Sequence, residues 1–208
     1  MNGQGSTTAR LKKNSGYPRF FMRSIKRPML FCQDVTGEDK HYGITSLLIV
    51  SILIPILTLV QNHSNTTQSL VDTLPATIII PFVYHISFFF VLCLTILVFI
   101  RLMKTDYHFG DVLARFGSFL NVSIFFTAIS LLFQLLTMST LSTFCLFLAL
   151  LHVLVAIAYT MHSFKAPFKT GLDPIYATLA LYVLLGLWFT STSDPITPLF
   201  LQSLLQMF

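Results

Sequence analysis

Long uncharged apolar runs alternate with short polar segments along this chain. The clearest run, residues 78–100, contains no Asp, Glu, Lys or Arg and is closed by Arg101 and Lys104. A helix of that length extends about 30 Å, which is the thickness of the hydrocarbon core of a bilayer. Because lipid offers no partner to an exposed backbone, such a run must pair its N–H and C=O groups within a helix. The pattern therefore predicts a transmembrane helix.

The same pattern predicts an all-α fold, a polytopic transmembrane helical bundle with five spans. The expected spans are about 43–60, 78–102, 116–137, 141–161 and 174–190. Pro55 lies inside the first span, where a kink is expected, and a turn at 138–140 makes an antiparallel hairpin of the third and fourth spans. In the final segment, 191–208, the apolar stretch 199–208 is too short to span and is predicted to be interfacial or re-entrant.

Residues 17–27, within the polar segment 1–42, predict an amphipathic helix that precedes the first span. Its two faces differ in chemistry, with Arg19, Arg23, Lys26 and Arg27 on one and Tyr17, Phe20, Phe21 and Ile25 on the other. Pro28 should end the helix, because proline lacks an N–H group. We expect the helix to lie in a membrane interface with its basic face on anionic headgroups. A solvated basic tail that only sets orientation is the alternative.

Charge is distributed along the chain in a way that predicts orientation. The chain has 208 residues, of which 54% are hydrophobic and 10% charged, well below the usual share of charged residues in soluble proteins. All 13 Lys and Arg residues fall in segments 1–42, 101–115 and 162–173, and none falls in 61–77, 138–140 or 191–208. Cytoplasmic loops carry the excess of Lys and Arg, so the N-terminus is predicted to be cytoplasmic and the C-terminus outside. This topology also accounts for the net charge of +5 without nucleic acid as a partner.

The predicted spans hold polar residues in rows but no charged residue well inside them. One row on the third span consists of Ser123, Thr127, Ser130, Gln134 and Thr137, and one on the fourth of Cys145, Ala149, His152, Ala156 and Tyr159. The lack of intramembrane charge argues against a pump or a proton-coupled carrier. Rows of small and polar residues let helices approach closely and hydrogen-bond to each other, so we expect the two rows to pack together. A polar path for a substrate or lipid is the alternative.

No catalytic, cofactor-binding or metal-binding motif is found in the sequence. His85 and His152 lie on different spans without a carboxylate or thiolate partner in the pattern, which falls short of a usual zinc site. The connector 101–115 contains neither a phosphate-binding glycine loop nor the order of residues needed for a catalytic triad. We therefore expect no cofactor and no enzymatic activity.

Two segments resemble the small Yip1-like membrane proteins of Gram-positive bacteria. One is the aromatic and basic segment 19–28, Arg-Phe-Phe-Met-Arg-Ser-Ile-Lys-Arg-Pro, which precedes a span that opens with Tyr42-Gly43-Ile44-Thr45. The other is the connector 107–117, where an aromatic residue and Gly110 precede a helix that re-enters the membrane. The resemblance implies five spans and a cytoplasmic N-terminus. The Asp-Leu-aromatic-Gly-Pro motif of the eukaryotic Yip1 proteins is absent, so their trafficking partners are not implied.

These observations favour a non-enzymatic integral membrane protein that acts as a scaffold or an accessory subunit of a membrane complex. Its expected partners are the bilayer, anionic headgroups at the cytoplasmic face, and either another membrane protein or a second copy of itself. A bacterial cytoplasmic membrane is the expected location. Two alternatives remain open, namely a small permease that uses the polar rows as its path and a membrane enzyme acting on lipid.

Overall fold

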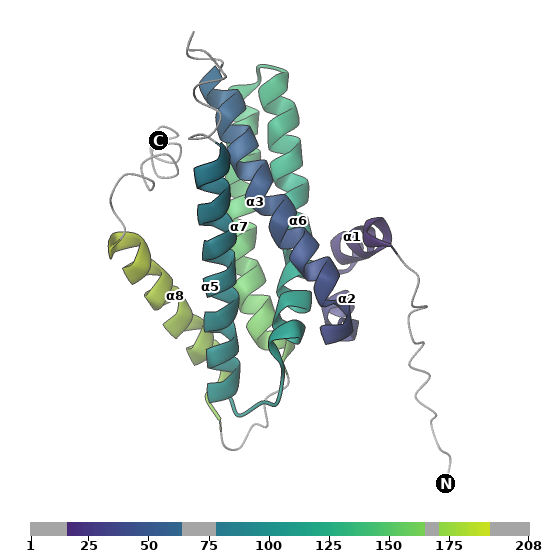
Figure 1. Cartoon of the computed structure of the whole chain (residues 1–208), viewed down its shortest axis with the longest axis vertical. Helices are drawn as coiled ribbons and strands as arrows, with labels where there is room; N and C mark the ends of the chain where they lie inside the picture. Colours follow the sequence, from purple (N-terminus) through teal and green to yellow (C-terminus); the bar gives the residue numbers. More distant parts are fainter. Residues whose placement is uncertain (1–15, 64–77, 165–170, 192–208) are drawn as a thin grey trace.

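A computed structural model describes residues 16–63, 78–164 and 171–191, and within these ranges every regular element is a helix (Figure 1). Residues 1–15 of the polar segment 1–42, much of the loop 61–77, part of the connector 162–173 and the stretch 199–208 lie outside the described residues. The elements are α1 (Tyr17–Lys26), α2 (Pro28–Asp34), the short 3-10 helix η1 (Gly37–Asp39), α3 (Lys40–His63), α5 (Ile80–Leu102), α6 (Phe109–Leu135), α7 (Ser139–Ser163) and α8 (Pro174–Ser191).

Four of the described helices, α3, α5, α6 and α7, are long and apolar enough to cross a membrane. They form a bundle, and α8, which is shorter, is inclined beside α5 (Figure 1). The fold is thus an all-helical bundle compatible with a membrane protein, as the sequence predicts. A fifth span, which would be α8, stays a prediction.

Two helix boundaries depend on features that hydropathy does not show, a side-chain cap at the start of α6 and a proline at the start of α2. Helix α6 begins at Phe109, although the third span was expected to begin at about 116. The Asp111 carboxylate accepts a hydrogen bond from the His108 N–H at 2.9 Å, which starts the helix within the polar connector. At the other boundary, α1 ends at Lys26 and Pro28 occupies the first turn of α2, where a missing N–H does no harm.

Helices α3 and α6 approach most closely at two glycines. A Cβ atom added to Gly117 would lie 2.4 Å from the Cα atom of Gly43, and one added to Gly43 would lie 2.1 Å from the carbonyl oxygen of Leu113. Only hydrogen fits at either position, so the two backbones are in direct contact. One turn further along both helices, the Ser46 hydroxyl donates to the Asn121 side-chain oxygen at 2.8 Å. Helices α3 and α6 therefore run in the same direction.

Helix α7 returns antiparallel to α6 after a short turn in which Thr137 adopts a positive φ of 61°. The Ser130 hydroxyl of α6 donates to the carbonyl oxygen of Ser142 on α7 at 2.7 Å. Nearer the other end of the pair, the rings of Phe119 and Tyr159 stack with their centroids 5.8 Å apart. These contacts produce the hairpin that the sequence predicts for the third and fourth spans.

We expect Gly117→Ala to destabilise the bundle, because its new methyl group would meet the Gly43 backbone rather than a movable side chain. The cost of such overpacking is about 1–3 kcal/mol, which is roughly 3–10 °C in melting temperature for a chain of this size. Thermal unfolding of the purified protein in detergent, followed by circular dichroism, measures it. Gly186→Ala is the matched control, since a Cβ there has no neighbour within 4 Å. Equal melting temperatures for the two variants would contradict the close contact.

Candidate functional site

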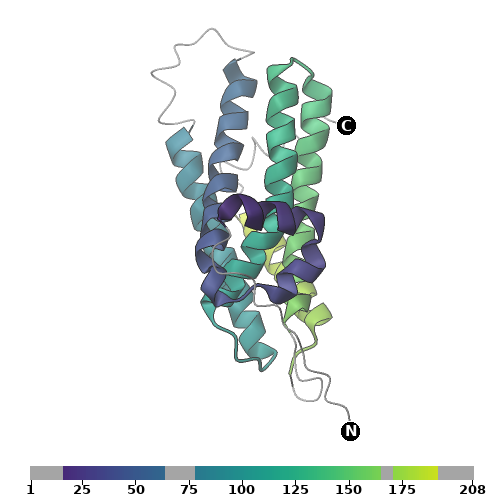
Figure 2. The same cartoon turned by 90° about the vertical axis from the view of Figure 1, so that its right-hand side faces the viewer.

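The first half of α6 is enclosed on all sides by other helices. Every residue from Val112 to Asn121 is buried, including the polar or charged Arg115, Ser118 and Asn121. Helices α1 and α2, η1, α3 and α7 all contact this stretch. Figure 2 shows α1 crossing in front of the long helices, with α2 continuing from it toward the lower end of the bundle. We call this part of the molecule, α1, α2 and η1 around residues 109–121 of α6, the collar.

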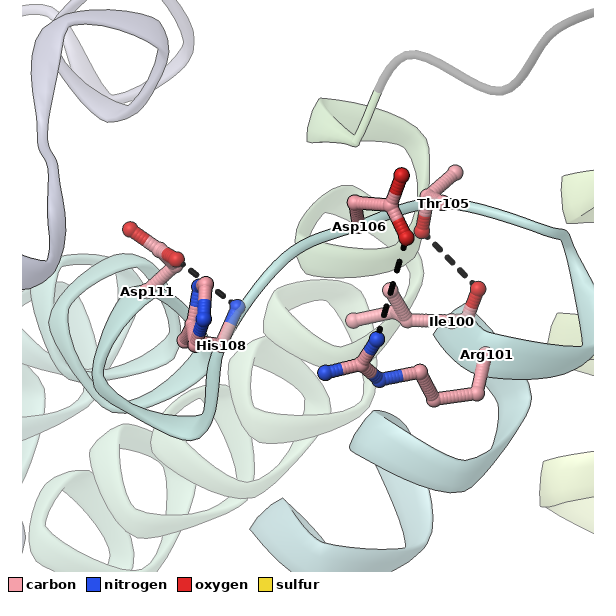
Figure 3. Close-up of polar contacts among 6 residues, drawn as sticks. All are labelled: Ile100, Arg101, Thr105, Asp106, His108 and Asp111. Atoms are coloured by element: carbon pink, nitrogen blue, oxygen red, sulfur yellow. Dashed lines mark hydrogen bonds and ion pairs between the residues drawn. The ribbon is translucent and has the colours of Figure 1, made fainter.

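Asp111 connects two elements of the collar, η1 and the start of α6. One of its carboxylate oxygens caps α6 at the His108 N–H (Figure 3), and the other accepts the N–H group of Gly37 in η1 at 2.7 Å. The same figure shows the connector before α6, where the Thr105 hydroxyl donates to the Ile100 carbonyl oxygen at 2.8 Å. A single carboxylate thus joins the start of α6 to the N-terminal part of the chain.

Asn121 is the centre of a buried hydrogen-bond network that holds α1. Its side-chain oxygen accepts from Tyr17 at 3.2 Å and from Ser46 at 2.8 Å, while its side-chain nitrogen donates to the Ser24 hydroxyl at 2.7 Å. Ser24 in turn donates to the carbonyl oxygen of Phe21 at 2.7 Å. Both ends of the amide are used, so one side chain links three helices. Because a buried polar group without a partner costs about 1–3 kcal/mol, the network strongly favours the docked position of α1.

Arg115 holds the C-terminal end of α2 against α7. It is 7% exposed, and its guanidinium donates to the carbonyl oxygens of Val35 at 3.4 Å and Ser163 at 2.6 Å. The same group lies over the rings of Tyr107 and Phe164, with distances of 5.0 and 4.5 Å to the centroids. Carbonyl dipoles and aromatic faces stabilise the buried positive charge here. Arg115 is the last residue of the connector 101–115 that the sequence predicts between two spans, and the structure buries it in the collar.

Cys32 is buried in the collar, and burial makes its thiol a poor nucleophile. Burial raises the pKa of the Cys32 thiol to about 11, against the smaller opposing effects of nearby Ser163, Arg115 and Ser118. A thiol with so high a pKa carries almost no thiolate at neutral pH, and the thiolate is the nucleophile. Cys32 therefore serves as a small apolar packing group.

The four basic residues predicted to contact anionic headgroups, Arg19, Arg23, Lys26 and Arg27, are exposed on α1 and at its end. The opposite, aromatic face of α1 packs on the bundle, where Phe20 is 4% exposed and its ring stacks on Tyr42 at 5.0 Å. The exposed surface of α1 and α2 also includes Met22, Met29 and Leu30.

The polar row of α6 is divided by the structure into a buried and a partly exposed part. Ser123, Thr127 and Ser130 are at most 1% exposed. The Thr127 hydroxyl donates to the Ser123 carbonyl oxygen in its own helix, and Ser130 donates to Ser142 of α7. Gln134 is half-buried. The buried hydroxyls of Thr127 and Ser130 thus bond to protein atoms.

The row predicted on α7 is less uniform. Ala149 and Ala156 are buried at the contact with α6, whereas Tyr159 is 40% exposed and lies over Phe119. His152 is half-buried, and its buried Nδ1 atom has no hydrogen-bond partner among the described residues. His85, on α5, bonds through Nδ1 to the carbonyl oxygen of Pro81 in its own helix at 2.6 Å. Within the described part of the chain, no group of three His, Cys, Asp or Glu residues is placed to hold a metal ion.

Sequence reasoning missed the residue that links most elements, Asn121. Its partners in α1 lie 97 and 104 residues away, and no local pattern connects them. A signal was present nonetheless, because a strongly polar amide inside a predicted span is costly in lipid unless it finds a partner. That rule should have marked Asn121 ahead of the row of hydroxyl groups.

A family model matches the whole of the helical region that the structure describes. Residues 10–196 match the model of a family described as a domain of unknown function, DUF6574. The chain is similar to the "Uncharacterized protein YvbI" of Bacillus subtilis (strain 168), with 29% identity over 173 residues that cover 82% of this chain and 72% of the relative. No solved structure matches. The family match includes every residue that the structure describes.

We expect Asn121→Ala to release α1 from the bundle, since it leaves Ser24 and Tyr17 without their buried partner. A loss of about 1–3 kcal/mol raises the population of the undocked form by roughly 5- to 150-fold. Limited trypsin digestion of the folded protein measures this as faster cleavage after Arg23 and Lys26, identified by mass. Thr143→Val is the control, because that exposed hydroxyl bonds only within α7. An unchanged rate of cleavage in Asn121→Ala would show that the network does not hold α1 against the bundle.

Proposed function

The chain belongs to the DUF6574 family, whose description assigns no activity, and we propose that it is a non-enzymatic, multi-pass membrane protein that acts as a scaffold or accessory subunit of a membrane complex. The observation that carries this proposal is the use made of the buried polar groups. Asn121, Arg115 and Ser130 all bond across helix contacts, so their chemistry joins helices together. A rigid bundle with an exposed basic collar is suited to holding partners at a membrane.

We place the protein in a bacterial membrane with five spans, the N-terminus in the cytoplasm and α8 as the fifth span. The distribution of all 13 Lys and Arg residues supports this orientation, and the Bacillus relative supports a bacterial setting. An apolar helix of 18 residues is about 27 Å long, close to the hydrocarbon thickness. The resemblance to the Yip1-like proteins agrees with the same topology.

The collar is the surface that we assign to anionic headgroups. Arg19, Arg23, Lys26 and Arg27 are exposed there without an acidic neighbour in α1. Juxtamembrane basic residues each contribute on the order of 1 kcal/mol of attraction to an anionic leaflet. The aromatic face of α1 packs on the bundle and does not face lipid. We therefore expect the basic residues, together with Met22, Met29 and Leu30, to make the contact with lipid.

A permease that uses the polar rows is the weaker candidate. Thr127 and Ser130 already bond to protein atoms, so their hydroxyls are poorly placed to replace the hydration of a polar substrate. Such a path would use Gln134 and Ser123, whose buried hydroxyl has no hydrogen-bond partner among the described residues. Solute flux in proteoliposomes that falls in Gln134→Leu would favour the permease over a scaffold.

Reporter fusions test the topology. A fusion after residue 208 should be active as alkaline phosphatase and dark as green fluorescent protein, because five spans place the C-terminus outside. A fusion after Asp106 is the control and should show the reverse, since the Lys/Arg-rich connector is expected in the cytoplasm. A fluorescent fusion after residue 208 would remove α8 as a span.

Co-purification tests the scaffold itself. The tagged full-length chain, extracted from its own membrane with a mild detergent after brief cross-linking, should carry one reproducible partner protein or a second copy of itself in near-stoichiometric amount. A matched preparation that lacks residues 1–15 shows whether the N-terminal tail supplies the contact. A chain that always emerges alone and monomeric, in both forms, would contradict the proposal.

A further inference from the structure

Helix α1 and the bundle border an open apolar groove on the protein surface. The groove has a volume of about 400 Å³ and is lined by Tyr17, Pro18, Phe21 and Met22 of α1, Ile49 of α3 and Ile124 of α6. Sites for small molecules and lipids commonly begin at about 300 Å³. Almost all of its wall is carbon, so the part of a ligand that enters it must be apolar.

The groove lies on one definite side of α1. Ser46 and Asn121 contact α1, and Ile49 and Ile124 each follow one of them by three residues, roughly 4.5 Å further along α3 and α6. Both helices run away from the end of the bundle where α3 and α6 begin. The groove therefore lies beside α1, toward the middle of α3 and α6. Figure 2 shows α1 crossing in front of the long helices.

Around the circumference of α1, the basic residues lie next to the residues that line the groove. At about 100° per residue, Lys26 and Arg19 lie within roughly 60° of Met22 around the helix, on the side turned away from Phe21. Arg19, Arg23 and Lys26 are all exposed, as is Met22. Around α1, the buried face with Phe20 and Ser24 is followed by the face that lines the groove, and this face is followed by the basic residues. The apolar groove thus lies directly beside a cluster of positively charged side chains.

From this juxtaposition we propose that the groove is a binding site for one anionic glycerophospholipid, with an acyl chain in the slot between α1, α3 and α6 and the phosphate on Arg19, Arg23 and Lys26. Charge complementarity selects a lipid of net negative charge, such as phosphatidylglycerol, over a zwitterionic one. Arginine is suited to the task because its planar guanidinium can bind two phosphate oxygens at once. The site rests on the proposed contact of the collar with anionic headgroups and adds to it a stoichiometry of one and a place for the acyl chain.

Native mass spectrometry of the full-length protein tests this site. The protein is released from detergent micelles that contain equal amounts of phosphatidylglycerol and phosphatidylcholine. The wild-type protein should retain one phosphatidylglycerol, with at least about a tenfold preference over phosphatidylcholine. The double variant Arg19→Gln/Arg23→Gln should lose that preference, and Arg101→Gln, which removes an exposed guanidinium elsewhere, should keep it.

A second pair of variants tests the slot. Ile49→Trp fills the groove from a half-buried position, and it should reduce retained phosphatidylglycerol by about tenfold. Ile175→Trp adds the same bulk at an exposed position of α8 and should have no effect. Circular dichroism melting confirms that each variant is folded.

The outcomes separate the site from the wider proposal. Loss in both the arginine variant and Ile49→Trp supports the site. Loss in the arginine variant alone overturns the slot but keeps the contact of the collar with headgroups. Equal retention by all variants, or equal retention of the two lipids, overturns the site and leaves only unspecific annular lipid, while the co-purification experiment still decides the scaffold.

Discussion

The contact between Gly43 and Gly117 sets the distance on which the N-terminal half of the structure depends. With no side chain at either position, α3 and α6 lie backbone to backbone. In lipid, where the hydrophobic effect does not drive helices together, such close packing is a main source of their association. One turn further on, the same closeness brings the Ser46 hydroxyl to Asn121, and that pair receives Tyr17 of α1. If α3 and α6 lay further apart, Ser46 could not reach Asn121, and the hydrogen bonds that hold α1 against the bundle would be lost.

Three polar side chains of the collar attach its short helices to the bundle. Asp111 joins η1 to the start of α6, Asn121 joins α1 to α3 and α6, and Arg115 joins the end of α2 to α7. Each of these groups would be costly to bury alone, and each is satisfied by a segment distant in sequence. The short helices before the first long one are therefore part of the folded bundle, although four exposed basic residues lie on α1 or next to it.

Hydropathy was enough to predict the helical class and the four long apolar helices, because lipid leaves the backbone few other options. It failed at the start of α6, since the cap formed by Asp111 is a side-chain interaction within a polar segment. It also could not tell which face of α1 meets the bundle. Phe20 and Tyr17 suit lipid and protein equally well, and only Asn121, whose partners lie far away in the chain, decides between them. The site of any partner protein has no comparable signal in one sequence.

The long helices do not all occupy the same depth. Figure 1 shows that α5 begins below the upper ends of α3, α6 and α7 and extends past them at the lower end, on the side of the bundle opposite α1. Along α5 the side chains of Val91, Leu94 and Val98 are exposed and apolar. A flat bilayer whose headgroups met α1 would leave the lower end of α5 in water. Covering it requires the bundle to lean or the bilayer to deform, at a cost of fractions of a kcal/mol per Å of hydrophobic mismatch. The offset of α5 would thus make the protein sensitive to membrane thickness.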